Sequence, residues 1–228
     1  SFNREMPEEI NRILTDHISS VLFCPTDVAV ENLKKEGIPN KKIKCTVVKT
    51  GDVMFDASNY YSSVATDKWL TENKLQVGNY ILATVHRAEN TNSLERLSNI
   101  IRALSWISDK LYQVVFPVHP RTMGIIDSNA DIKNKLNKSS IKVIPAIGYL
   151  DMICAERNSR LIMTDSGGVQ KEAYFHKKLC ITLRNETEWK EIVESGWNKL
   201  SGLKFETIVN SVKEMLENEP SKLAYPNL

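Results

Sequence analysis

The ten residues from Thr164 to Ala173 combine a glycine pair with side chains suited to binding an anion. The apolar run 161–163 leads into them and a helical pattern follows, which predicts a strand, a glycine turn and the start of a helix. Gly167 and Gly168 let the backbone approach a ligand closely, and the unpaired N–H groups of a helix's first turn attract phosphate. We therefore expect an anionic ligand at this turn.

Glu172 lies about one turn into the same predicted helix. Its charge would repel a diphosphate, but a carboxylate can accept hydrogen bonds from the two hydroxyls of a ribose. The glycine turn and Glu172 together indicate a nucleotide. An ordinary strand-to-helix turn, capped by Ser166 or Asp165, has the same composition, so the residues alone leave both interpretations open.

Polar side chains follow three predicted strands at the points where the strands end. His86 and Arg87 follow one strand, His119 follows the next, and Ser166 with Gly167 follows the third. Ligands of open α/β sheets gather at the carboxyl ends of the strands, so these groups predict a site on one rim. A single histidine at a strand end is more often a structural hydrogen-bonding group.

Strands and helices alternate along the chain, which predicts a doubly wound α/β fold with a parallel sheet covered on both faces. Residues 51–56 mark a crossing between two lobes. The predicted strands are 21–24, 43–48, 80–85, 114–118, 141–144, 161–163 and 179–182. The predicted helices are 7–19, 26–36, 54–70, 94–110, 123–136, 149–156, 168–176, 188–195 and 205–216.

The composition excludes several classes of protein. The 228 residues are 42% hydrophobic and 25% charged, as in an ordinary soluble globular protein. A net charge of +2 spread over mixed lysines and acidic residues disfavours nucleic-acid binding, and no apolar stretch is long enough to span a membrane. The cysteines stand singly, without the spacing of a metal site, so we expect buried, reduced thiols in a cytoplasmic protein. They are Cys24, Cys45, Cys154 and Cys180.

Blocks along nearly the whole chain resemble the non-hydrolysing UDP-N-acetylglucosamine 2-epimerases. The stretch from Thr164 to Ala173, with its flanks, is similar to the uridine-nucleotide signature of that family. The other similar blocks, in the family's order and spacing, are Met6–Arg12, Thr15–Ile18, Pro25–Thr26, His86–Asn90, Pro117–Pro120, Leu183–Glu188 and Glu194–Gly196.

The resemblance implies two Rossmann-like lobes around a cleft, the glycosyltransferase-B arrangement. Residues 1–50 would be the C-terminal part of a first lobe that is incomplete, with its opening strands before Ser1. Residues 51–78 would form the crossover segment. Residues 79–228 would form a second lobe that binds the uridine nucleotide.

The resemblance also assigns roles to residues at the rim. His86 matches the histidine of the family's His-Arg-Arg-Glu block, which contacts the nucleotide sugar and takes part in catalysis. Glu8 matches the acid/base carboxylate of a Pro-Glu-Glu block, although an acidic residue in a first helical turn is also what the helix dipole favours. The expected substrate-binding residues are Arg87, Ser166, Gly167, Gly168, Glu172, Arg184 and Glu188. His119 matches a family block, but a structural part in the His-Pro turn is the better interpretation.

The implied reaction is inversion at C2 of UDP-N-acetylglucosamine, through elimination and re-addition of UDP. It needs no NAD and no metal, and the expected partners are the UDP-sugar and a second copy in a homodimer. Ala88 and Trp189 replace arginines of many bacterial members and favour archaeal members or epimerases acting on UDP-2,3-diacetamido-glucuronate. Two alternatives stay open: a chain that only binds UDP without turnover, and a glycosyltransferase of the same fold, which would not explain the Met6–Arg12 block.

Overall fold

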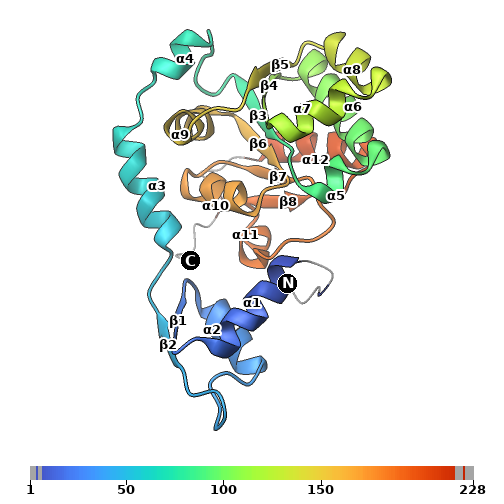
Figure 1. The fold of residues 1–228 in the computed structure, drawn as a ribbon. Coiled ribbons are helices and arrows are strands. Elements are labelled where there is room, and N and C mark those ends of the chain that lie inside the picture. The colour runs from blue at the N-terminus through green and yellow to red at the C-terminus, as the bar shows by residue number, and fades with distance from the viewer. Residues whose placement is uncertain (1–3, 5–6, 219–222, 224–228) are drawn as a thin grey trace. The chain divides into compact units, whose positions relative to one another are not determined.

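The computed structural model describes residues 4, 7–218 and 223 of the chain (Figure 1). Its contacts divide the chain into two compact units, with the boundary between Ala57 and Ser58. We call the unit before this boundary unit 1 and the unit after it unit 2. The boundary lies inside a helix, α3 (Val53–Val64). The functional division at residues 50 and 78 stays a prediction.

Unit 2 is built on a six-stranded parallel sheet, which confirms the predicted α/β class. The strand order is β5-β4-β3-β6-β7-β8, so the chain winds outward in both directions from β3 and β6. The strands are β3 (Tyr80–Thr84), β4 (Gln113–Val118), β5 (Lys142–Pro145), β6 (Leu161–Thr164), β7 (Cys180–Thr182) and β8 (Asn198–Leu200).

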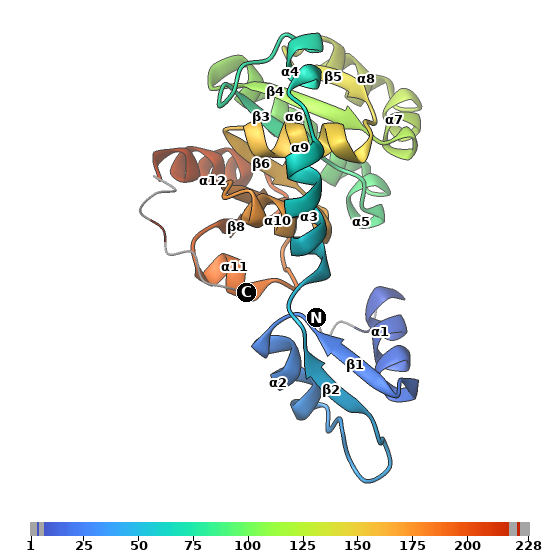
Figure 2. The ribbon, with the colours of Figure 1, turned by 90° about the vertical axis from the view of Figure 1, so that its left-hand side faces the viewer.

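Helices cover both faces of this sheet, and for that reason its central strands are apolar at nearly every position. Helices α9 (Tyr149–Asn158) and α10 (Gly167–Phe175) lie on one face, while α6 (Leu94–Lys110) and α12 (Phe205–Glu217) pack together on the other (Figures 1 and 2). Every residue of β3 and β6 is buried. The remaining helices of unit 2 are α4 (Lys68–Glu72), α5 (Ala88–Thr91), α7 (Pro120–Asp127), α8 (Ala130–Asn137) and α11 (Lys190–Glu194).

The described part of unit 1 contains a parallel strand pair, two helices and the first residues of α3. Strand β1 (Val21–Cys24) pairs with β2 (Thr46–Lys49), with Val21 opposite Thr46. The helices are α1 (Pro7–Ile18) and α2 (Asp27–Lys35), and Thr26 caps α2 as its side chain accepts from the amide of Ala29. A small core of Leu22, Cys24, Leu33 and Ile38 holds the unit together.

Two predicted helices are wrong in their extent. The segment 54–70 is interrupted between α3 and α4, and the segment 123–136 is divided between α7 and α8. The second break has a clear cause, because the Asn129 side chain caps α8 by accepting a hydrogen bond of 3.0 Å from the amide of Ile132. The short elements α5 and β8 were not predicted, since neither is long enough to show a periodic pattern.

The cysteines are free thiols, buried at Cys24, Cys154 and Cys180 and partly exposed at Cys45. Among the described residues, no helix is long and apolar enough to cross a membrane.

Candidate active site

Asp165 joins the ends of the two central strands of unit 2. It follows β6, is fully buried, and its carboxylate accepts hydrogen bonds from the amides of His86 at 3.1 Å and Arg87 at 3.0 Å. The side-chain amide of Asn90 donates a further bond of 2.9 Å to it. A buried carboxylate with these charge-assisted bonds fixes the loop after β3 against the loop after β6. The sequence offered Asp165 only as a possible helix cap, and this bridging role was missed.

Ser166 caps α10, and the glycines occupy the first turn of that helix. The Ser166 hydroxyl accepts a hydrogen bond from the amide of Val169 at 3.4 Å, and the backbone carbonyl of Ser166 accepts one from the amide of Gln170 at 3.2 Å. The amides of Gly167 and Gly168 precede these two at the open end of the helix, where the dipole favours an anion. Ser166, one of the two residues expected as a cap, is thus the cap of α10. The role of this turn in binding an anion stays a prediction.

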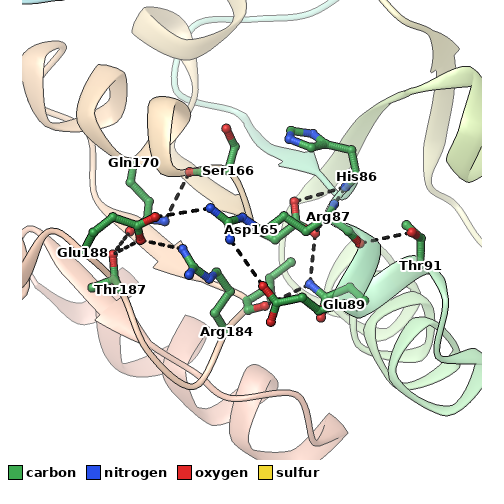
Figure 3. Close-up of polar contacts among 12 residues, drawn as sticks. His86, Arg87, Glu89, Thr91, Asp165, Ser166, Gln170, Arg184, Thr187 and Glu188 are labelled. Carbon is green, nitrogen blue, oxygen red and sulfur yellow. Dashed lines mark hydrogen bonds and ion pairs between the residues drawn. The ribbon is translucent and has the colours of Figure 1, made fainter. Parts of the chain in front are cut away.

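Two arginines from different loops converge on Glu188 (Figure 3). Arg184, which follows β7, donates to one carboxylate oxygen of Glu188 at 2.7 Å, and Arg87 donates to the other at 3.2 Å. Arg87 also pairs with Glu89 at 3.3 Å. Burial raises the pKa of Glu188, but its own backbone amide together with Arg184 and Arg87 outweighs burial, so the net pKa lies below the ordinary value. Glu188 is therefore an anion at neutral pH.

A buried polar network holds the loop that carries Glu188. The Thr187 hydroxyl donates to the side-chain oxygen of Gln170 at 2.7 Å, and the Asn198 amide donates to the same oxygen at 3.1 Å. Gln170 in turn donates to the carbonyl of Ser166 at 3.2 Å. The loop after β7 is thereby tied to the first turn of α10. Gln170 and Asn198 were not predicted, because their partners lie far away in sequence.

His86 and His119 lie on the same rim of the sheet. Their ring centroids are 6.5 Å apart, and both line a pocket of about 160 Å³ that also contains Val169 of α10. The His86 side chain is exposed, and Figure 3 shows its ring turned away from the Asp165 carboxylate. His119 caps α7 through a hydrogen bond of 3.2 Å from the Arg121 amide to Nδ1. The structural interpretation of His119 is therefore confirmed.

Glu172 lies in the second turn of α10, largely buried, and makes a hydrogen bond with Tyr149. Burial raises its pKa, although the Tyr149 bond favours the charged form. Burial likewise raises the pKa of Tyr149 to about 12.

Glu156 of α9 is a second buried carboxyl group close to Glu172. It is fully buried, and neither of its oxygens has a hydrogen-bond partner among the described residues. Burial and the charge of Glu172 raise its pKa well above the ordinary value. His176 Nε2 lies 3.7 Å from Glu156 and 3.3 Å from the Ser58 hydroxyl, and burial lowers the pKa of His176 to about 4. A catalytic triad needs one ring nitrogen at the hydroxyl and the other at the carboxylate, whereas here Nε2 faces both groups, so this is not a Ser-His-Glu triad.

Glu8 lies in unit 1, exposed in the first turn of α1. Its neighbour Glu9 is buried and accepts a hydrogen bond of 2.8 Å from Arg12, which lowers the pKa of Glu9. Glu9 is thus a structural partner within unit 1, and the catalytic role of Glu8 stays a prediction. Among the described residues, no group of three or more histidine, cysteine or acidic side chains is arranged to hold a metal ion.

Comparison with known proteins agrees with this architecture. The family model for UDP-N-acetylglucosamine 2-epimerase matches residues 1–227. A UDP-N-acetylglucosamine 2-epimerase homolog from Methanococcus maripaludis is 48% identical over 217 residues, which is 94% of this chain and 58% of the relative. The UDP-2,3-diacetamido-2,3-dideoxy-D-glucuronate 2-epimerase of Pseudomonas aeruginosa is 46% identical over 217 residues, 95% of this chain and 58% of the relative.

A solved structure with the same fold comes from Methanocaldococcus jannaschii: UDP-GlcNAc 2-epimerase in complex with UDP-GlcNAc and UDP. It superimposes with a TM-score of 0.88 at 40% identity, over 100% of this chain and 62% of that chain. The chain thus spans about three fifths of the length of these relatives. The motif blocks, the parallel sheet and these matches agree: the chain belongs to the UDP-N-acetylglucosamine 2-epimerase family.

Proposed function

We propose that unit 2 binds a UDP-sugar at the carboxyl rim of its sheet, with the diphosphate at the first turn of α10. The observation that carries this proposal is the convergence of Arg87 and Arg184 on Glu188, which lies beside Gly167. Fixed amide donors and guanidinium groups stabilise a diphosphate far better when they are positioned in advance. Ser166 supplies the cap that sets the direction of these amides.

We expect the ribose of the same ligand to lie at Glu172. A carboxylate in the second turn of the helix is one turn away from the phosphates, so repulsion between the two is reduced while the ribose hydroxyls donate to it. The relative from M. jannaschii has been solved in complex with UDP-GlcNAc and UDP, and its likeness to this chain supports a uridine nucleotide.

The proposed reaction is epimerisation at C2 of UDP-N-acetylglucosamine to UDP-N-acetylmannosamine, for surface polysaccharide precursors. A carboxylate base, for which Glu8 is the candidate, takes the C2 proton while the C1–O bond breaks and its electron pair leaves with UDP. UDP then adds back to C1 of the glycal, and a proton returns to the other face of C2. His86 contacts the sugar, and the groups around α10 stabilise the charge that grows on UDP. We expect the whole protein to act as a homodimer.

UDP-2,3-diacetamido-glucuronate is the second candidate substrate. The relative from P. aeruginosa that is named for this substrate is 46% identical, similar to the 48% of the M. maripaludis homolog. The third candidate is binding of UDP without turnover. Incubation with each UDP-sugar separates the three cases, and product formation in heavy water should place deuterium at C2. Retention of all the original hydrogen would contradict the elimination mechanism.

The nucleotide site is tested by calorimetry with UDP on Gly167→Val. A Cβ on Gly167 would lie 3.4 Å from Glu188 and 3.5 Å from the indole nitrogen of Trp189, so a branched side chain there obstructs the mouth of the site. We expect roughly tenfold weaker UDP binding. Gly124→Val is the matched control, because Gly124 lies in a helix and has open space around its Cβ position. Equal UDP affinity in the two variants would contradict the proposed site.

A further inference from the structure

The anion-binding end of α10 already has a carboxylate beside it. One Glu188 oxygen lies 3.4 Å from the position that a Cβ on Gly167 would take. The same carboxylate bridges Arg184 at 2.7 Å and Arg87 at 3.2 Å, so it meets the groups assigned above to the diphosphate (Figure 3). A Cβ at position 167 would lie in van der Waals contact with Glu188, so Glu188 lies directly against the first turn of α10.

Glu188 and an incoming diphosphate would compete for the same positively charged groups. Two guanidinium groups and a helix N-terminus face Glu188, and the other carboxylate paired with Arg87, Glu89, is 49% exposed and therefore screened by water, so positive charge remains in excess. Glu188 itself is only partly exposed. A diphosphate carries more negative charge than Glu188 and offers more acceptor oxygens. Both anions can use the same donors, but like charges cannot share them without a large cost.

Two further N–H groups beside Glu188 lack an acceptor. The Nε of Arg184 and the Nε1 of Trp189 are both enclosed and have no hydrogen-bond partner among the described residues. Arg184 is 4% exposed. The Lys171 ammonium group lies over the Trp189 ring, 4.5 Å from its centroid. Buried donors without acceptors are costly, so an additional acceptor at this point would be favourable.

We propose that Glu188 is an internal anion that occupies the diphosphate site of the free protein, and that an incoming diphosphate displaces it from Arg87 and Arg184. Its departure exposes the unpartnered N–H groups of Arg184 and Trp189 to the ligand's oxygens. Glu188 therefore limits the affinity of the site for anions while holding both arginines in place. The identity of the ligand as a UDP-sugar rests on the proposed function, whereas the competition itself applies to any diphosphate.

The test compares Glu188→Gln with the wild-type chain by calorimetry, using UDP, inorganic pyrophosphate and uridine. Glutamine keeps the shape of the side chain and removes its charge. We expect UDP and pyrophosphate to bind on the order of tenfold tighter to Glu188→Gln, while the affinity for uridine, which has no phosphate, stays unchanged. Glu194→Gln, on the exposed end of α11, removes the same charge and should change each affinity less than about twofold.

The outcomes separate this inference from the proposed function. Tighter pyrophosphate binding without any UDP binding would support the internal anion and reject the nucleotide site. UDP binding that is equal or weaker in Glu188→Gln would overturn the internal anion and leave the nucleotide site standing. Absence of binding by either anion in both proteins would overturn both.

A measurement on the wild-type chain decides the matter if the variant does not fold. The indole N–H resonance of Trp189, assigned with Trp189→Phe, should shift when pyrophosphate is added, because the ligand brings an acceptor to that donor. An unchanged resonance at saturating pyrophosphate would overturn the inference.

Discussion

Strands β1 and β6 each have four residues, all apolar in β1 and all apolar except Thr164 in β6, but their surroundings differ. In β6 all four residues are buried, whereas in β1 they alternate between exposed and buried. Phe23 of β1 is 70% exposed and Val21 is 44% exposed. An apolar strand sequence therefore indicates that both faces of the strand could be buried. Whether a face is in fact covered depends on the neighbouring elements of the fold. Unit 2 covers both faces of its sheet, and the described part of unit 1 leaves one face of β1 open.

The two units also treat a buried glutamate differently. Glu9 in unit 1 pairs with Arg12, and its pKa is lowered by that contact. Glu156 in unit 2 has no hydrogen-bond partner among the described residues, and burial raises its pKa. The first arrangement favours the charged form and the second favours the neutral acid. A charged glutamate can thus stabilise or destabilise the folded unit, depending on the partner that the fold provides.

The largest effect expected from this contrast is on core packing. Leu82→Ala in β3 removes a fully buried side chain and should lower the free energy of unfolding of unit 2 by about 2–5 kcal/mol. All four tryptophans, at 69, 106, 189 and 197, lie in unit 2, so their fluorescence during urea unfolding reports this unit alone. Leu14→Ala in unit 1 replaces a side chain that is 59% exposed. It should lower the free energy of unfolding of unit 1 by no more than about 0.5 kcal/mol, as measured by circular dichroism. Equal losses would contradict the difference in packing.

A smaller effect separates the two glutamates by pH. The folded pKa of Glu156 is raised, so the stability that its neutral form provides is lost as pH rises from its unfolded pKa towards the folded one. The glutamine of Glu156→Gln does not titrate. Within this window the free energy of unfolding of the variant should therefore rise relative to that of the wild type by up to about 1.4 kcal/mol per pH unit. Unfolding monitored by tryptophan fluorescence between about pH 5 and 8 measures this gain.

Glu9→Gln should show the opposite sign. The folded pKa of Glu9 is lowered, so its contribution is present above the unfolded pKa and disappears as pH falls through the folded value. This variant should be less stable than the wild type at neutral pH and approach it in acid, as followed by circular dichroism. Parallel pH profiles for both variants and the wild type would contradict the two assignments.

The fold class and the helix 94–110 were predictable from periodicity, because long amphipathic and uniformly apolar segments carry a strong local signal. The breaks at Ser128 and after Val64 were not, since a turn of a few residues interrupts a pattern without changing its period. Among the candidate site residues, the rim positions followed from strand ends. The contacts of Asp165, Gln170 and Glu156 depend on partners from other elements, and no spacing in the sequence indicates them.

The smallest expected effect on stability concerns the open face of β1. Phe23→Ser replaces a side chain that is 70% exposed, so the free energy of unfolding of unit 1 should change by no more than about 0.5 kcal/mol. Exposed apolar patches promote association, and the variant should therefore self-associate less than the wild type in sedimentation experiments at increasing concentration. Leu22→Ser, one residue away, is the matched control: Leu22 is 8% exposed and belongs to the core of unit 1, so this change should unfold the unit. If Phe23→Ser destabilised unit 1 as much as Leu22→Ser, the Phe23 face would have to be covered in solution, and the contrast between the two sheets would fail.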